Sequence, residues 1–170
     1  MHNSDLKFRF HTLVREKGGY KSHHAHFDKA NLITPDRLEL SMRDMQEKWS
    51  LYRSLKENYT EEDLKNRIRA CVYNLAGQGC RSMRTFIDAD TIVGTMPMRV
   101  AASLRDENKK YKVNIELATQ PLEGVFGESA KIFEQCCEMA DVIGGLPSRD
   151  RDFGDVKHVQ RILSIGKEMN

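Results

Sequence analysis

The sequence has few of the features that mark membrane, secreted or nucleic-acid-binding proteins. No apolar run approaches the ~20 residues that a membrane-spanning helix needs, and the N-terminal stretch MHNSDLKFRF has no apolar segment of a secretory signal. Lysine plus arginine (27) nearly balances aspartate plus glutamate (25), which leaves a net charge of +2. That charge is too small to indicate attraction to nucleic acid or to a membrane surface. We therefore expect a cytoplasmic protein with neither partner.

Cysteine is also scarce, and its spacing excludes the common metal and redox motifs. The four cysteines are Cys71, Cys80, Cys136 and Cys137. None of them forms a Cys-x-x-Cys pair, and the adjacent pair falls within a helical pattern. We expect buried, reduced thiols. The length of 170 residues suits one domain with a real core.

Glycines divide the chain into an N-terminal arm, residues 1–19, and a domain, residues 20–170. The arm carries Lys7, Arg9, Arg15 and Lys17 and ends in two glycines. After it, segments with strand character alternate with segments of helical periodicity, an order that implies parallel strands and right-handed crossovers. The sequence thus predicts an α/β fold of four βα units, which is half of a (β/α)8 TIM-like barrel, with an extra helix after the first strand.

The first predicted strand is rich in histidine. The segment 18–28, GGYKSHHAHFD, suits a strand of about six residues flanked by glycines. At the period of two of a strand, His24, His26 and Asp28 lie on one face. His23 lies on the opposite face, and we expect it to be structural. The first strand therefore presents two imidazoles on the same side.

Two helices are predicted between the first and second strands. The first begins at Thr34-Pro35, and its apolar residues recur at steps of three and four, which predicts core packing. These residues are Leu38, Met42, Met45, Trp49, Tyr52 and Leu55. The second helix begins at a capping box formed by Thr60 and Asp63.

The rest of the chain repeats the strand–helix order three times. Strands are predicted at 80–90, at 112–121 and at the start of 141–152, and helices at 96–111, 128–140 and 155–169. Polar residues follow each strand, at the edge of the sheet where parallel α/β folds place their functional loops.

Four segments, in order, resemble one enzyme family. HAHFD (24–28) resembles a first-strand His-x-His-x-Asp signature, and MRTFIDAD (83–90) resembles an Arg-Thr-His-x-Asp second strand. ELATQPLEGVFG (116–127) is similar to a third strand ending in Pro-x-Glu-Gly, and ADVIGGLPSRDRD (140–152) to an Ala-Asp-x-x-Gly-x-x-Pro fourth strand. This is the pattern of the amidohydrolase superfamily, in its cytosine-deaminase-like branch.

The resemblance implies a TIM-like barrel and a set of site residues. It makes His24 and His26 ligands of a divalent metal, zinc or iron, whose bound hydroxide attacks the carbon of a C–N bond. It makes Asp28 a residue that positions the metal ligands without binding the metal itself. Gln120 and Glu123 become candidates for contact with a small-molecule substrate.

The acids after the second strand admit two interpretations. Asp88 is a candidate for contact with the substrate or the metal ligands, but Asp88 and Asp90 together could simply end the strand and cap the helix near Thr91. Arg84 could pair with Asp88. The polar run at 147–152 is interpreted as a solvated loop.

Several family features are missing between residues 20 and 170. Phe86 stands where the branch often has histidine, Leu122 stands at the position of a substrate-binding glutamine, and His158 falls on the last helix, away from the strand ends. The family takes its other metal ligands from strands five, six and eight. We therefore expect the N-terminal half of a metal-dependent amidohydrolase, which needs a complementary C-terminal half for activity. The alternative is a noncatalytic half-barrel that forms a homodimer.

Overall fold

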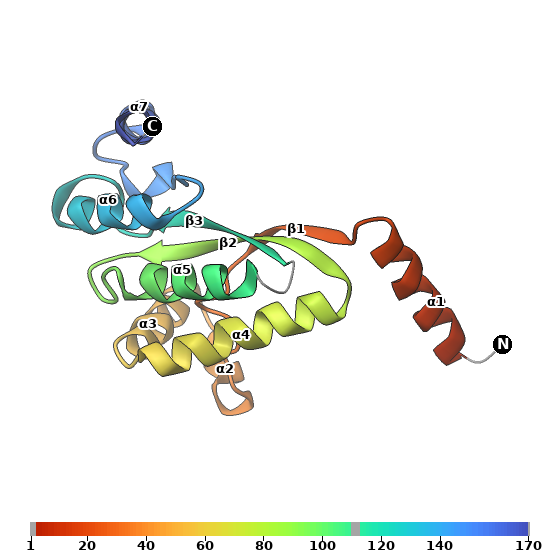
Figure 1. The fold of residues 1–170 in the computed structure, drawn as a ribbon. Coiled ribbons are helices and arrows are strands. Elements are labelled where there is room, and N and C mark those ends of the chain that lie inside the picture. Colours follow the sequence, from red (N-terminus) through yellow and green to blue (C-terminus); the bar gives the residue numbers. More distant parts are fainter. Residues whose placement is uncertain (1–2, 110–112, 170) are drawn as a thin grey trace.

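A single parallel sheet organises the chain. The computed structural model describes residues 3–109 and 113–169, and within them the sheet has the order β1-β2-β3 (Figure 1). The strands are β1 (Tyr20–Ala25), β2 (Cys80–Ala89) and β3 (Asn114–Pro121). Both pairings are parallel. The predicted α/β class with parallel strands is confirmed.

The predicted fourth strand is reduced to one bridge. Val142 pairs with Ala118 in parallel beside β3, and the side chain of Asp141 accepts a hydrogen bond from the Leu117 backbone N–H at 2.8 Å. The ladder ends there, because Gly144 packs directly against the Thr119 carbonyl and the chain then turns away. The short fourth strand expected here is thus a single parallel bridge, and the segment lies beside β3, where a fourth strand belongs.

Helices cover one face of the sheet. They are α4 (Glu61–Gly77), α5 (Met96–Asn108) and α6 (Ala130–Met139). The last helix, α7 (Asp155–Glu168), follows α6 at the C-terminal end. Short turns, η3 (Gly127–Ser129) and η4 (Pro147–Arg149), precede α6 and α7. Residues 110–112, where the predicted helix 96–111 meets the predicted strand 112–121, lie outside the described residues.

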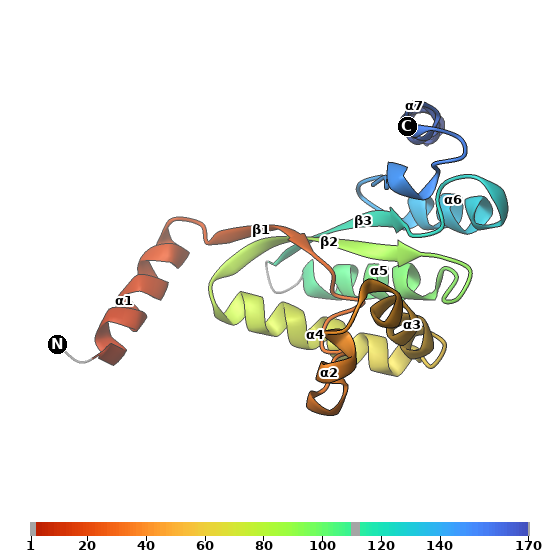
Figure 2. The same ribbon diagram turned by 180° about the vertical axis from the view of Figure 1, so that it is seen from behind.

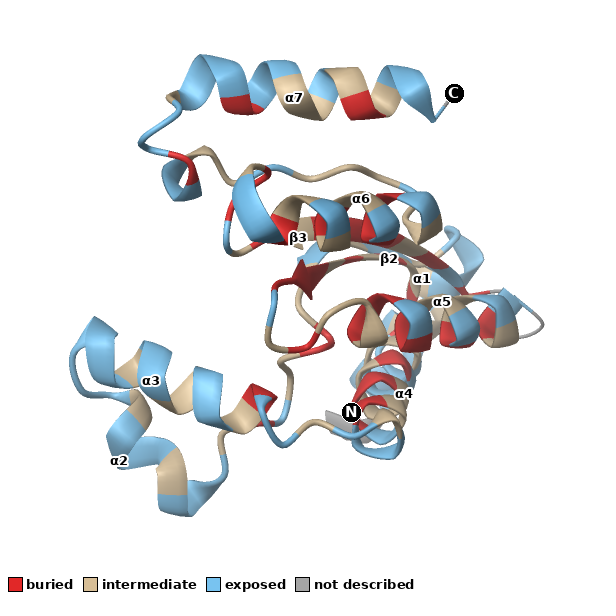
Figure 3. Cartoon of the chain, turned by 90° about the vertical axis from the view of Figure 1, so that its left-hand side faces the viewer, coloured by how far each residue is buried: buried red, intermediate tan, exposed pale blue. Residues whose placement is uncertain are grey.

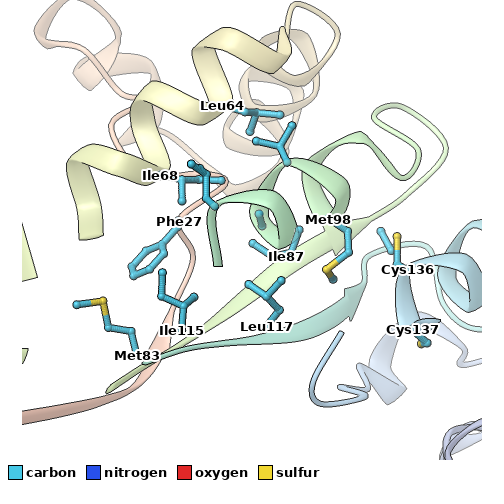
Figure 4. Packing of buried hydrophobic residues seen from close by; sticks show 14 of the residues in the cluster. Phe27, Leu64, Ile68, Met83, Ile87, Met98, Ile115, Leu117, Cys136 and Cys137 are labelled. Atoms are coloured by element: carbon cyan, nitrogen blue, oxygen red, sulfur yellow. The ribbon is translucent and has the colours of Figure 1, made fainter. Parts of the chain in front are cut away.

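The core lies between this helical layer and the sheet (Figure 4). Alternation along β2 sets its two faces: Met83, Thr85 and Ile87 are buried toward the helices, whereas Arg84 and Phe86 on the other face are half exposed. The largest fully buried apolar side chains are Leu64, Ile68, Met83, Ile87, Met98, Leu104, Leu117, Phe133 and Ile165. One face of the sheet is therefore covered and the other is open.

The helical segment 35–56, between β1 and α4, stands away from the core (Figure 3). It contains η1 (Pro35–Arg37), α2 (Leu38–Ser41) and α3 (Met45–Lys56). Instead of one helix there is a break, where Asp44 caps α3 by accepting hydrogen bonds from the backbone N–H groups of Gln46 and Glu47. The predicted core packing of this segment was wrong, since Met42 is 77% and Trp49 45% exposed.

The N-terminal arm is a helix, α1 (Asn3–Glu16), that projects from the start of β1 (Figures 1 and 2). Gly18 and Gly19 have positive φ and turn the chain into β1. Leu6, Phe8 and Leu13 are exposed along the helix. None of the described helices is both long and apolar enough to cross a membrane.

Candidate functional site

A pocket of about 580 Å³ opens where the strands end. Its lining residues come from the loops after β1, β2 and β3, from α3 and from η4. The lining residues are His26, Lys29, Ala30, Lys48, Trp49, Tyr52, Arg53, Lys56, Asp88, Asp90, Ile92, Leu122, Glu123 and Arg149. The volume is in the range of small-molecule sites.

The two predicted histidines converge beside this pocket. The Nε2 atoms of His24 and His26 lie 3.1 Å apart, and Phe86 packs under both rings, with centroids 4.7 and 5.9 Å away. A register shift between Ser22 and Ala25 interrupts the pairing with β2 at this point. Burial, helped by the charge of Lys29, lowers the pKa of His26. His26 is therefore uncharged near neutral pH, the form in which imidazole binds metals.

Two converging imidazole nitrogens fit part of a metal centre. A catalytic zinc site usually has three protein ligands, and the described residues contain no group of three or more histidine, cysteine, aspartate or glutamate side chains able to hold an ion. A metal held by His24 and His26 needs additional ligands from outside this set.

Asp28 is a buried link between the ends of two strands. Its Oδ2 accepts a hydrogen bond from the Asp88 backbone N–H at 3.0 Å, and its carbonyl accepts from the Tyr59 hydroxyl at 2.9 Å and from Arg67. Burial and the nearby charge of Asp88 raise the pKa of Asp28 to about 7. The residue holds the chain that follows His26 against β2 and α4.

Asp88 lies between two lysines. Lys29 Nζ is 2.7 Å from one carboxylate oxygen and Lys56 Nζ is 2.6 Å from the other. Lys29 also donates to Gln120 Oε1 at 3.1 Å. Burial opposes the charge of Lys56, but Asp88 and Asp90 outweigh it and raise the pKa of Lys56. Asp88 is thus neutralised within the protein, and Gln120 orients Lys29 rather than lining the pocket itself.

The expected pairing of Arg84 with Asp88 was wrong. Arg84 forms an ion pair with Glu116 on the neighbouring strand. Four residues of extended chain separate Arg84 from Asp88 by about 13 Å, too far for a contact along one strand. The arginine therefore belongs to the open face of the sheet and not to the pocket.

Asp90 and Glu123 shape the loops at the strand ends. Asp90 Oδ1 accepts hydrogen bonds from the backbone N–H groups of Ile92 and Val93. Both oxygens of Glu123 accept from Thr91, one from its backbone N–H at 2.8 Å and one from its hydroxyl at 3.0 Å. Asp90 therefore caps the turn that precedes α5, and Glu123 at the pocket rim ties that turn to the loop after β3.

One wall of the pocket was missed by the sequence analysis. Lys48, Trp49, Tyr52, Arg53 and Lys56 all lie on one side of α3 and line the pocket. Their spacing of three and four is the signal that could have identified this face, because it mixes cations with aromatic rings, whereas a core stripe is purely apolar.

The buried His158 holds the loop around η4, on the opposite wall of the pocket, in place. His158 Nδ1 lies 2.6 Å from Asp150 Oδ2, and Nε2 accepts a hydrogen bond from the Leu146 backbone N–H at 3.0 Å. This corrects the expectation that His158 lies away from the strand ends. These two hydrogen bonds of His158 fix the loop that carries Arg149. The guanidinium carbon of Arg149 lies 5.1 Å from the centre of the Trp49 ring. The two walls of the pocket meet at this contact.

Comparison with known proteins identifies the fold. No family model matches the sequence. An uncharacterized protein of Haemophilus influenzae is 34% identical over 152 residues, which cover 85% of this chain and 55% of that protein. The chain therefore spans about half the length of this curated relative.

Solved structures of two enzymes are similar. One is 5-methylcytosine deaminase from Klebsiella pneumoniae, solved with 5-fluorocytosine and with phosphonocytosine, at a TM-score of 0.75 and 20% identity over 89% of this chain and 37% of that one. The other is N-isopropylammelide isopropylaminohydrolase from Burkholderia multivorans, at a TM-score of 0.68 and 22% identity over 89% and 38%. The chain therefore has a deaminase-like fold, which corresponds to part of each of these two enzymes.

Proposed function

We propose that this chain supplies the first four βα units of a metal-dependent amidohydrolase that cleaves or deaminates C–N bonds in a small molecule. The observation that carries the proposal is the convergence of His24 and His26 Nε2 atoms at the end of β1, beside a pocket of enzyme-like size. The deaminase-like fold supports it.

His24 and His26 are the residues that would hold zinc or iron. Such a metal, when bound, supplies Lewis-acid activation of water for attack on carbon. Phe86 supports both rings from below, and the buried Asp28 fixes the backbone that follows them. Lys29, held by Asp88 and Gln120, keeps a positive charge close to His26.

A complementary C-terminal half is part of the proposal. The solved neighbours are much longer than this chain, which covers 37–38% of them. The sheet face that carries Arg84 and Phe86 is open, and open sheet faces and edges favour association with further chain. The remaining strands would cover this face and bring the missing ligands to His24 and His26.

The test is to co-express this chain with a matching C-terminal half and to measure bound metal and hydrolysis of aminopyrimidines and cyclic amides. We expect bound zinc or iron and turnover in the assembled pair, both lost in a His24→Ala/His26→Ala double variant. His23→Ala, an exposed neighbour on the other face of β1, is the matched control and should keep both. An assembled pair without metal and without turnover rules the proposal out.

A second candidate is a noncatalytic homodimer, favoured by an exposed apolar stripe on α7. Val156, Val159 and Leu163 share one side of that helix and are 47–70% exposed. A second copy of the chain could cover this stripe. Light scattering distinguishes the two cases: a stable dimer of the chain alone, unchanged by His24→Ala/His26→Ala, favours the homodimer, and a monomer that assembles with the C-terminal half favours the enzyme.

A further inference from the structure

The charges that line the pocket are unequal. Five lining residues carry a positive charge and three carry a negative charge. The cations are Lys29, Lys48, Arg53, Lys56 and Arg149, and the anions are Asp88, Asp90 and Glu123. The excess of cations favours an anionic ligand.

Three of the five cations already have acidic partners. Lys29 pairs with Asp88, Lys56 pairs with Asp88 and Asp90, and Arg53 pairs with Glu57 outside the pocket. These three cations are balanced by acids of the same chain, so they leave no unpaired positive charge for a ligand. The anionic oxygens of Glu123 are themselves engaged by Thr91.

Lys48 and Arg149 are different, because neither has an ion pair with an acid among the described residues. They come from opposite walls, α3 and η4, and both lie next to Trp49: Lys48 precedes it in sequence, and Arg149 packs over its ring. A stacked guanidinium keeps its N–H groups at the edge free to donate hydrogen bonds. Both line the pocket, so together they give it positive charge that is not paired with an acid among the described residues.

The remaining lining suits a flat ring. Trp49, Tyr52, Ile92 and Leu122 offer apolar and aromatic surface, and Leu122 offers no hydrogen bond to a polar ring edge. From this combination we infer that the pocket takes a planar heterocycle that bears a carboxylate, with the ring against the apolar lining and the carboxylate on Lys48 and Arg149. A carboxylate matches the planar donor geometry of arginine.

This inference rests on the proposed function for the location of the substrate, but it makes a separate claim about binding. It can be tested on the chain alone, without metal or turnover. Trp49 is the single tryptophan of the sequence, so its fluorescence reports directly on occupancy of the pocket.

The experiment titrates the chain with orotate, a pyrimidine carboxylate, with uracil, its neutral counterpart, and with uridine monophosphate. Affinity is measured by calorimetry and location by Trp49 emission. We expect orotate to bind at least about tenfold more tightly than uracil, since a charge-assisted hydrogen bond typically contributes that much. Lys48→Gln and Arg149→Gln should each remove most of this preference for orotate over uracil.

Arg151→Gln is the matched control, because Arg151 is an exposed arginine in the same loop that does not line the pocket. It should bind orotate like the unmodified chain, and circular dichroism should show the same fold for all three variants. Equal affinity for orotate and uracil, no saturable binding of either, tighter binding of uridine monophosphate than of orotate, or an unchanged preference in both variants would each overturn the inference. Loss of metal and turnover in the assembled pair, with the orotate preference intact, would overturn the proposed function alone.

Discussion

At the scale of single residues, the sequence predicts positions better than partners. The period of two along the first strand placed His24 and His26 on one face, and in the structure their Nε2 atoms are 3.1 Å apart. The partners of the charged residues were not predictable, because Lys56 reaches Asp88 and Asp90 from a helix whose placement depends on tertiary packing. Local patterns carry no information about such long-range contacts.

The pair of His158 and Asp150 should contribute strongly to stability. His158 is 1% exposed and the side chain of Asp150 is buried with it. We expect His158→Ala to lower the free energy of unfolding by about 3 kcal/mol, because it leaves the buried Asp150 carboxylate with only the Val125 backbone N–H as donor and opens a cavity. Urea unfolding measures the change. His23→Ala is the control, and a His158 variant as stable as that control would contradict the prediction.

The cysteines should differ in reactivity. Burial raises the pKa of Cys137 to about 11 and that of Cys136 to about 12. At pH 8, three units below, only roughly one Cys137 thiol in a thousand is the reactive thiolate, and the fraction rises about tenfold for each pH unit. We expect iodoacetamide to label the half-exposed Cys71 first and the other two only after unfolding. Equal labelling of Cys71, Cys136 and Cys137 in the folded protein would count against this.

At the scale of elements, the same periodic pattern led to opposite outcomes. The helix after Thr60 was predicted from its capping box and apolar spacing, and α4 is capped by Thr60 and buries Leu64, Ile68 and Val72. The pattern before it also had apolar residues at helical spacing, yet α3 has an exposed apolar side and lines a pocket. Periodicity identifies a helix with one apolar side, but it does not say whether that side meets the core or a ligand.

This difference gives a paired prediction for the two helix caps. Thr60→Ala and Asp44→Ala each remove a side chain that accepts backbone N–H groups, a loss of about 1 kcal/mol to the helix. We expect Thr60→Ala to lower the global free energy of unfolding by that amount, because α4 is part of the core. Asp44→Ala should instead increase hydrogen exchange within α3 and leave global stability nearly unchanged. Equal global effects of the two variants would contradict it.

At the scale of the whole molecule, the order of strands and helices was enough to predict the parallel sheet. The fourth strand was overestimated because VIGG reads as a short apolar strand, whereas Gly144 meets the Thr119 carbonyl and the chain leaves the sheet. The position of α3 over the strand ends could not be derived, since it depends on the ion pairs of Lys56 and on the contact between Trp49 and Arg149. These long-range contacts close the pocket.

The parallel register also determines how long β1 waits for its partner strand during synthesis. Tyr20 pairs with Cys80, a separation of 60 residues, and ribosomes add 5–20 residues per second, so β1 waits about 3–12 s for its partner to be made. Helices α3 and α4 are produced in that interval and need no distant partner to begin forming. β1 therefore remains unpaired while α3 and α4 begin to form, and it joins the sheet only after β2 has been synthesised.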